Sequence, residues 1–332
     1  MIPETKQGAV ARALNEAFGV KDVEDIRPLT AGLSSALVFR IVVHNRPYLL
    51  KVITRTDEIS DPTRQFSCMK SGADRGIAPR VLYTNIEDRL WITDFVEARP
   101  FSAQEALFHL PGTLRRLHAL RPFPHTGNYF DKIDRFIRGL AKSLPESEAE
   151  NLFDIYSRVT EVYPRHDESD WVSSHNDLKP ENIAFDGDRM WLVDWEAAFF
   201  NDRYLDLAVV ANFAVNSEAD EHAYLRAYFG EPAGEYRLAR FFLMRQILHI
   251  LYAMVFLPLA AAAGKAVDTN QDAPDFKDFH RRMLAGEVSL ADADAKLKYG
   301  LVHLKQIHEN LQTPRFQDAL QIVHTPTSEA EL

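Results

Sequence analysis

The chain has 332 residues, which exceeds the usual size of a single domain, so we expect two lobes that share one interface. Apolar residues make up 46% and charged residues 26%, a composition that excludes extended disorder except at the chain ends. The formal net charge is −10 and no basic tract is present, which argues against a nucleic-acid partner.

The cysteine content and the N-terminal segment indicate the compartment. Cys68 is the single cysteine, so an internal disulfide is excluded and a reducing compartment is favoured. Residues 1–19 have the pattern of an amphipathic helix, without the basic start, apolar centre and small-residue cleavage site of a secretory signal. We therefore expect a cytoplasmic protein in which Cys68 is a buried residue rather than a nucleophile.

Short β-rich runs fill the first part of the chain. From Asp25 to about Val52, the runs IRPLT, ALVFRIVV and PYLLKVI are separated by small or polar residues, which predicts an antiparallel meander. A helix is predicted over about residues 61–73, and Gly76–Pro79 breaks it before two more strands, RVLYTN and RLWITDFV. The pattern predicts a small sheet that ends near Phe95.

The second part of the chain has helical periodicity, interrupted once. Apolar residues recur at i, i+3 and i+4 over residues 103–120, 131–144 and 148–163, and helices resume from about Tyr204, including 235–263 and 290–310. Between them lies one β-rich island, WVSSHNDLKPENIAFDGDRMWLVDWEAA, with a hairpin turn at its centre. Strands followed by helices predict an α+β fold.

One apolar stretch approaches the length of a membrane span. Residues 247–264 read ILHILYAMVFLPLAAAAG, which is close to the roughly 20 apolar residues that cross a bilayer. His249 and Pro258 interrupt this stretch, and no other segment resembles a span. A helix that is apolar on all sides is also what the centre of a large helical lobe requires, so we expect a core helix and no membrane span.

The β-rich island carries three polar side chains at set spacing. Asn182 follows Asp177 by five positions, and Asp194 ends the next hairpin strand. Phosphoryl transfer from ATP uses a carboxylate to orient and deprotonate the acceptor hydroxyl, and an amide oxygen and a second carboxylate to hold Mg²⁺. Although such residues are common in ordinary turns, the register of strand, loop and hairpin predicts Asp177 as the base and Asn182 and Asp194 as metal ligands, with ATP and Mg²⁺ as cofactors.

Two features of the predicted sheet are suited to ATP phosphates. The turn containing Gly32, Ser34 and Ser35 has small residues and free amides that are able to lie over phosphate groups, although its one glycine is weak evidence alone. Lys51 lies within the apolar strand YLLKVI, where a phosphate partner would offset the cost of burying an ammonium. The alternative for Lys51 is a surface lysine whose stem alone is buried.

The segment that joins the two parts is predicted to bind adenine. The backbone of Asp94, Phe95 and Val96 would hydrogen-bond the base while the apolar side chains pack against it. Any extended linker has a similar sequence, so a simple connection is the alternative.

Three more residues of the β-rich island and the following helix have two interpretations each. Glu196 is expected either to reach a second Mg²⁺ or the acceptor, or to form a surface ion pair. Asp206 is expected either to accept hydrogen bonds from the backbone amides of the catalytic loop or to cap a helix. His175 is expected to tie the loop to the core rather than to act as a base.

The segments HNDLKPEN, LVDWEAAFFNDRYLDLA and GIAPRVLY resemble the choline/ethanolamine kinase branch of the aminoglycoside phosphotransferase-like kinases, in particular its bacterial choline kinase-like members. This resemblance implies a bilobal protein-kinase-like fold, with residues 1–95 as the nucleotide-binding lobe and 96–332 as the catalytic and substrate-binding lobe. It also implies the same roles for Asp177, Asn182, Asp194 and Lys51. The His-Asn-Asp-Leu form of the loop favours amino-alcohol substrates.

Two positions depart from that family. A glutamate usually pairs with the nucleotide-binding lysine from the following helix, but here Gln65 or Ser67 stands near the expected place, while Glu58 and Asp74 lie farther off. The helix that carries a tryptophan for the trimethylammonium group in choline kinases has none near Tyr252. Tyr252 or Phe256 is able to replace it, and the alternative is that both are core residues.

These features predict an ATP-dependent kinase whose acceptor is a small alcohol, most simply choline, ethanolamine or a related amino alcohol. We expect Glu196, Asp202 and Tyr252 to contact a cationic acceptor. The alternatives are an aminoglycoside or sugar kinase of the same family, and a nucleotide-binding pseudokinase regulator. A protein kinase is not supported, because the Asp-Phe-Gly and Ala-Pro-Glu motifs are absent. The sequence does not indicate an oligomeric state.

Overall fold

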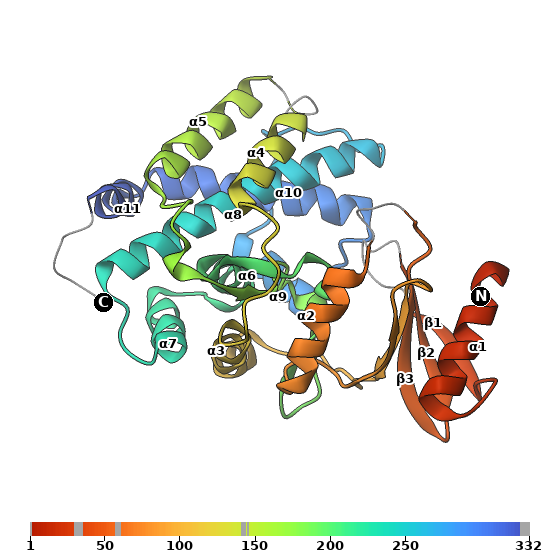
Figure 1. Cartoon of the computed structure of the whole chain (residues 1–332). Coiled ribbons are helices and arrows are strands. Elements are labelled where there is room, and N and C mark those ends of the chain that lie inside the picture. Colours follow the sequence, from red (N-terminus) through yellow and green to blue (C-terminus); the bar gives the residue numbers. More distant parts are fainter. Residues whose placement is uncertain (1, 30–35, 57–60, 141–143, 145, 326–332) are drawn as a thin grey trace.

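The computed structural model describes residues 2–29, 36–56, 61–140, 144 and 146–325, and it places a sheet at one end of the molecule and most helices at the other (Figure 1). The sheet is antiparallel, with five strands in the order β1-β2-β3-β5-β4. These strands are β1 (Asp25–Leu29), β2 (Leu37–Val43), β3 (Arg46–Val52), β4 (Val81–Asn85) and β5 (Leu90–Asp94). The predicted meander is confirmed.

The two longest strands are joined by a tight turn. His44 and Asn45 both have positive φ, 50° and 57°, as a two-residue hairpin turn that follows the twist of the strands requires. In β2, Phe39, Ile41 and Val43 are buried and face helix α1 (Glu4–Phe18), whose apolar side covers one face of the sheet. The amphipathic N-terminal helix is therefore part of the sheet's own core.

Helix α2 (Thr63–Asp74) lies between the sheet and the helical part (Figure 1). Its buried residues Phe66 and Met69 belong to the main core, where Phe66 contacts Trp91 of β5 with ring centres 5.2 Å apart. Gly72 allows close approach to Trp195, because a Cβ atom at this position would lie 2.7 Å from the indole ring. This packing holds α2 against the segment that follows Asp194.

The helical part confirms the predicted α+β order, with shifted helix ends. Its helices are α3 (Ala103–His118), α4 (Tyr129–Leu140), α5 (Glu146–Val162), α6 (Arg203–Ala214), α7 (Glu218–Phe229), α8 (Glu235–Ala262), α9 (Phe276–Leu284), α10 (Ala293–Leu311) and α11 (Pro314–His324). The last long helix begins at Ala293 rather than 290 because Asp292 caps it by accepting a hydrogen bond from the amide of Ala295 at 3.0 Å.

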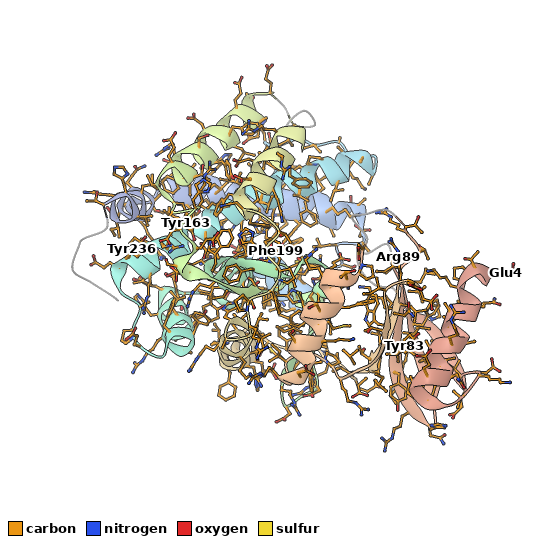
Figure 2. The ribbon with its side chains drawn as sticks, viewed as in Figure 1. Glu4, Tyr83, Arg89, Tyr163, Phe199 and Tyr236 are labelled. Atoms are coloured by element: carbon orange, nitrogen blue, oxygen red, sulfur yellow. The ribbon has the colours of Figure 1, made fainter. Side chains whose placement is uncertain are left out.

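Helix α8 is the central helix of this part. It packs against α10, α11 and α6, and side chains fill the spaces between these helices (Figure 2). By length and composition α8 is able to cross a membrane, but 72% of its most apolar stretch is buried within the structure. This burial is what the core-helix interpretation expects.

The β-rich island forms two small antiparallel pairs beside the sheet. Strands β7 (Ile183–Phe185) and β8 (Met190–Leu192) form the predicted hairpin, and β6 (Trp171–Ser174) pairs with β9 (Phe199–Asp202). Strand β9 was not predicted from the sequence. Its partner lies more than 20 residues earlier in the chain, so no local hairpin signal marks it.

Candidate active site

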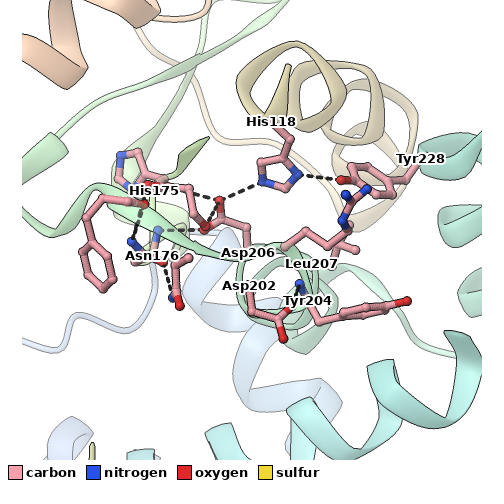
Figure 3. A network of polar contacts seen from close by, with 12 residues as sticks. His118, His175, Asn176, Asp202, Tyr204, Asp206, Leu207 and Tyr228 are labelled. Carbon is pink, nitrogen blue, oxygen red and sulfur yellow. Dashed lines mark hydrogen bonds and ion pairs between the residues drawn. The ribbon is translucent and has the colours of Figure 1, made fainter. Parts of the chain in front are cut away.

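The loop between β6 and β7 carries Asp177 and is held by one buried carboxylate, Asp206 of α6 (Figure 3). Asp206 accepts hydrogen bonds from the backbone amides of His175 at 2.9 Å and Asn176 at 2.7 Å, and from the hydroxyl of Ser174 at 2.8 Å. The loop-binding interpretation of Asp206 therefore agrees with the structure. The cap of α6 is Asp202 instead, which accepts from the amide of Tyr204.

A second residue reaches Asp206 from α3. His118 Nε2 lies 3.0 Å from the Asp206 carboxylate, and its Nδ1 lies 2.7 Å from the hydroxyl of Tyr228 (Figure 3). Since an ionised carboxylate only accepts, His118 donates from Nε2, and a neutral ring then accepts from Tyr228 at Nδ1. Burial alone would raise the pKa of Asp206, but these hydrogen bonds and the nearby histidines hold it below its usual range.

The loop is also tied to the segment that follows Asp194. His175 Nε2 donates to the carbonyl oxygen of Val193 at 3.0 Å, and Asn176 donates to that of Ala197 at 3.0 Å. Asn176 has φ of 66°, a conformation that few non-glycine residues adopt and that is concentrated at functional sites. Burial lowers the pKa of His175, so the ring is neutral at pH 7 and positions the loop, as the sequence analysis expected.

Asp177 and Asn182 lie in contact. The side-chain amide of Asn182 donates to the carbonyl oxygen of Asp177 at 2.7 Å and to its carboxylate at 2.9 Å. Lys179 also binds the Asp177 carboxylate at 2.8 Å. Because the Asn182 nitrogen is used in this way, its side-chain oxygen is the atom left to bind a cation.

Asp194 follows strand β8 in a left-handed backbone conformation, with φ of 64° and ψ of 66°. Its Oδ1 lies 2.5 Å from Nζ of Lys51, which is buried on β3. Lys51 also lies 5.3 Å from the centre of the Trp91 ring. The partner of Lys51 in this structure is therefore the carboxylate of Asp194, and Gln65 of α2 lines the same cavity without a carboxylate to offer.

That cavity is a cleft of about 430 Å³ between the sheet and the helical part. The site residues predicted from the sequence that line it are Lys51, Asp94, Phe95, Val96, Asn182, Asp194 and Glu196. The apolar residues Val38, Leu49 and Leu192, which the sequence analysis did not identify, supply walls able to enclose a flat base. Gly32, Ser34 and Ser35, as well as Glu58, lie outside the described residues.

A second cavity of about 430 Å³ adjoins this cleft and contains Asp177. Lys179, Phe256 and Leu290 line both spaces, so the cavities share a border. The second cavity has five aromatic lining residues from three helices: Tyr129, Phe136, Tyr252, Phe256 and Tyr299. Only Tyr252 and Phe256 were identified from the sequence, because the others come from helices distant in the chain and no local motif marks them.

The aromatic wall of the second cavity is continuous. Tyr299 lies 5.6 Å from Tyr252 and 4.8 Å from Phe256 between ring centres. Burial raises the pKa of Tyr129, Tyr252 and Tyr299, and the negative charge of Asp177 adds to each shift. These tyrosines are therefore neutral and lie near the Asp177 carboxylate.

Two acids expected at the acceptor are found elsewhere. Glu196 lines the cleft that contains Lys51 and Asp194, and it does not line the aromatic cavity. Asp202 is buried and accepts hydrogen bonds from Arg240 at 2.8 Å and from the Tyr163 hydroxyl at 2.8 Å. Asp202 therefore serves as a helix cap and ion-pair partner in the core, and the expected acceptor contact is corrected accordingly.

Comparisons with known proteins agree with this geometry. The model of the phosphotransferase enzyme family, APH, matches residues 25–242, which is more than half of the chain. Protein LicA of Haemophilus influenzae is 28% identical over 127 residues, which are 38% of this chain and 48% of LicA. The chain thus matches about half the length of that relative.

Solved structures show the same fold. A choline/ethanolamine kinase family protein from Mesorhizobium loti has a TM-score of 0.68 at 20% identity, over 96% of this chain and 99% of that chain. The ternary complex of APH(2")-IIa with streptomycin and ATP has a TM-score of 0.56 at 15% identity, over 80% and 98%. The expected bilobal protein-kinase-like fold is confirmed. Because the family match covers more than half of the chain, the protein belongs to the phosphotransferase enzyme family.

Proposed function

We propose that the protein transfers the γ-phosphoryl group of ATP to the hydroxyl of a small amino alcohol, with choline as the first candidate. The observation that carries this proposal is the position of one short loop at the border of two cavities. Asp177 lines the aromatic cavity, while Asn182, five residues later, lines the cleft that contains Lys51 and Asp194. An acceptor and a nucleotide bound in these spaces would meet at Asp177.

In this proposal Asp177 accepts the proton of the acceptor hydroxyl as the hydroxyl oxygen bonds to the γ-phosphorus, and the bond from that phosphorus to the departing ADP oxygen breaks. Its two bonded neighbours, Asn182 and Lys179, fix the carboxylate toward the shared border. Lys51 would contact the phosphates, and the backbone of Asp94, Phe95 and Val96 would bind adenine. The proposed location is the cytoplasm, where ATP is present and the buried thiol of Cys68 stays reduced.

The oxygen atoms near Asp194 fit a magnesium ion. The Asp194 carboxylate and the free side-chain oxygen of Asn182 line the same cleft, and Mg²⁺ prefers such oxygen ligands. When bound with ATP, the ion would neutralise negative charge on the phosphates. Asp194 and Asn182 would be the ligands of the ion, and Lys51, on the sheet, would add a positive charge to that of the ion.

The aromatic cavity favours a quaternary ammonium group. A trimethylammonium group has no hydrogen to donate and is bound well by the faces of aromatic rings, whereas a primary ammonium needs several hydrogen-bond acceptors. The wall formed by Tyr252, Phe256 and Tyr299 supplies rings, and Asp177 is the one carboxylate among the described lining residues. This observation supports choline over ethanolamine.

Two alternatives have weaker support. An aminoglycoside carries several ammonium groups and would need several acids, yet the described lining of the acceptor cavity offers only Asp177. A pseudokinase has no chemical need for Asp177, Asn182, Asp194 and Lys51 together, and all four lie at the two adjoining cavities.

Detection of ADP with a panel of choline, ethanolamine, sugars and aminoglycosides tests the proposal. We expect choline to have a specificity constant about tenfold or more above that of its neutral carbon isostere, because the rings attract only the cation. Tyr252→Leu should reduce this preference, while Phe108→Leu, a matched change at an exposed ring on α3, should not. Equal specificity constants for choline and its neutral isostere would contradict a cationic acceptor. A protein that produces no ADP with any alcohol would contradict the kinase assignment.

A further inference from the structure

Lys132 of α4 is a half-buried cation in the wall of the acceptor cavity. Its Nζ donates a hydrogen bond to the Thr126 hydroxyl at 2.6 Å and lies 4.2 Å from the centre of the Phe199 ring, which is labelled in Figure 2. Within the described part of the chain, Lys132 forms no ion pair with a carboxylate. Its ammonium charge therefore has no carboxylate partner among those residues.

The other cavity lysines differ in this respect. Lys51 and Lys179 also line the two adjoining spaces, and each holds a carboxylate, Asp194 at 2.5 Å and Asp177 at 2.8 Å. A partly buried ammonium without a counter-charge loses hydration that is not replaced, so proteins normally pair such groups. Lys132 departs from that pattern at a place where a ligand is expected.

Two further cations surround Lys132. Arg64 of α2 donates to the backbone carbonyl oxygens of Glu196, at 2.8 Å, and of Ala198, and its guanidinium lies 5.9 Å from the same Phe199 ring. Arg135 of α4 donates to the carbonyl oxygen of Asp131 at 3.2 Å. Burial first, and then the charges of Arg64 and Arg135, lower the pKa of Lys132. Three cations therefore lie close to one another in a chain whose net charge is −10.

We propose that Lys132 binds an anionic oxygen group inside the acceptor cavity, either the phosphoryl group of the phosphorylated product or an anionic group that the acceptor itself carries. This inference rests on the proposed function for its assignment of the cavity to the acceptor. Lys132 shares the cavity with Asp177, and a phosphoryl group that arrives there brings two negative charges close to a carboxylate. A cation with no carboxylate partner offsets that repulsion.

Binding measurements without ATP isolate this role from turnover. Lys132→Met keeps the apolar stem and removes the charge, Lys132→Arg restores a charge, and Lys70→Met makes the same charge change at an exposed position on α2. The probes are phosphocholine for the product, carnitine for an acceptor with its own carboxylate, and choline as the ligand without an anionic group.

We expect Lys132→Met to weaken phosphocholine binding about tenfold, to change choline binding less than twofold, and to lose most of this difference in high salt. Lys132→Arg should recover binding, and Lys70→Met should match the parent. A tenfold effect on carnitine without one on phosphocholine would assign the anion to the acceptor rather than to the product.

Three results would overturn the site. The first is that Lys132→Met binds both anions as tightly as the parent does. The second is that Lys132→Met weakens the binding of phosphocholine and of choline equally, which would indicate a purely structural residue. The third is that the parent protein binds neither anion. A parent that binds phosphocholine but produces no ADP with any alcohol of the panel would instead contradict the proposed function and leave the Lys132 site intact.

Discussion

Nζ of Lys51 lies 2.5 Å from Oδ1 of Asp194, so a strand of the sheet is joined directly to the carboxylate that follows strand β8. The pair crosses the cleft in which we place the nucleotide. In the described residues of α2 the cleft is lined by Gln65 and Met69, neither of which carries a negative charge to neutralise an ammonium. Asp194 therefore neutralises Lys51 in this structure and is also the carboxylate available to a metal ion.

Asp194→Ala tests the metal assignment. We expect it to weaken Mg-ATP binding about tenfold or more, because one oxygen ligand and its charge are lost, while ATP without Mg²⁺ should bind no more weakly, because Lys51 loses its carboxylate partner. Calorimetry with and without Mg²⁺ gives both affinities. Asp188→Ala, on the exposed hairpin turn, is the matched control. Mg-ATP affinity equal to that of the parent would show that Asp194 holds no metal.

Asp177→Asn tests the proposed base. We expect the turnover number to fall roughly 100-fold or more with ATP affinity nearly unchanged, since an amide cannot accept the proton and the loss falls on the transition state. The hydrogen bond from Asn182 to the backbone oxygen of Asp177 remains possible, so the loop should keep its shape. Steady-state rates and nucleotide titration measure the two quantities, and an undiminished turnover number would exclude Asp177 as the base.

Asp206→Asn tests the support beneath the loop. An amide offers one acceptor oxygen where the carboxylate now binds two backbone amides, a serine hydroxyl and His118. We expect a loss of about 3 kcal/mol in the free energy of unfolding, because hydrogen bonds to a buried charge are broken. Denaturant titration measures this loss. Asp278→Asn, which breaks only an exposed ion pair with Arg281, should cost less than about 1 kcal/mol. Similar values for the two variants would contradict the role of Asp206.

The sequence allowed prediction of those site features that lie close together along the chain. Asp177 and Asn182 are five residues apart, and Asp194 follows by one hairpin, so local spacing was enough to group them. The bonding of Asp206 to the loop amides was one of two interpretations, and the structure selects it. Turn and hairpin chemistry act over short distances, which is why the sequence alone was enough to group these residues.

The features that the sequence left out depend on tertiary packing. Tyr129 and Phe136 come from α4 and Tyr299 from α10, and each residue alone looks like an ordinary core aromatic. Asp202 was expected near the acceptor because it is close in sequence to Asp194, but β9 and the start of α6 carry it into the core, to Arg240. Proximity along the chain does not fix the direction in which a side chain points.

A cluster of three buried histidines behind the acceptor cavity makes stability depend on pH. His249, His280 and His303 are buried, the Nδ1 atoms of His249 and His303 lie 2.8 Å apart, and the His303 ring lies 4.5 Å from that of Tyr299. Burial lowers the pKa of all three, with nearby Arg245 adding to each shift, and the pKa of His280 falls to about 4.

The sign of the effect follows from the protons bound in each state. Below pH 6.5 an unfolded histidine takes up a proton that the folded, neutral His280 does not, so the unfolded chain gains stability as the pH falls. The contribution of His280 is fully present above pH 6.5 and is lost progressively down to about pH 4. Each such histidine adds a slope of about 1.4 kcal/mol per pH unit to the free energy of unfolding.

Denaturant unfolding between pH 6.5 and 5 measures this slope in a range where most carboxylates stay ionised. His280→Asn should lower the slope by about 1.4 kcal/mol per pH unit, which corresponds to one proton, because the group that titrates is gone. This change in slope does not depend on how the variant alters stability at pH 7. His222→Asn, which removes a half-exposed histidine from α7, should leave the slope nearly unchanged. If His280→Asn and the parent have the same slope, the ring of His280 is already protonated in the folded protein. That result would contradict the inference that the histidines behind Tyr299 are neutral.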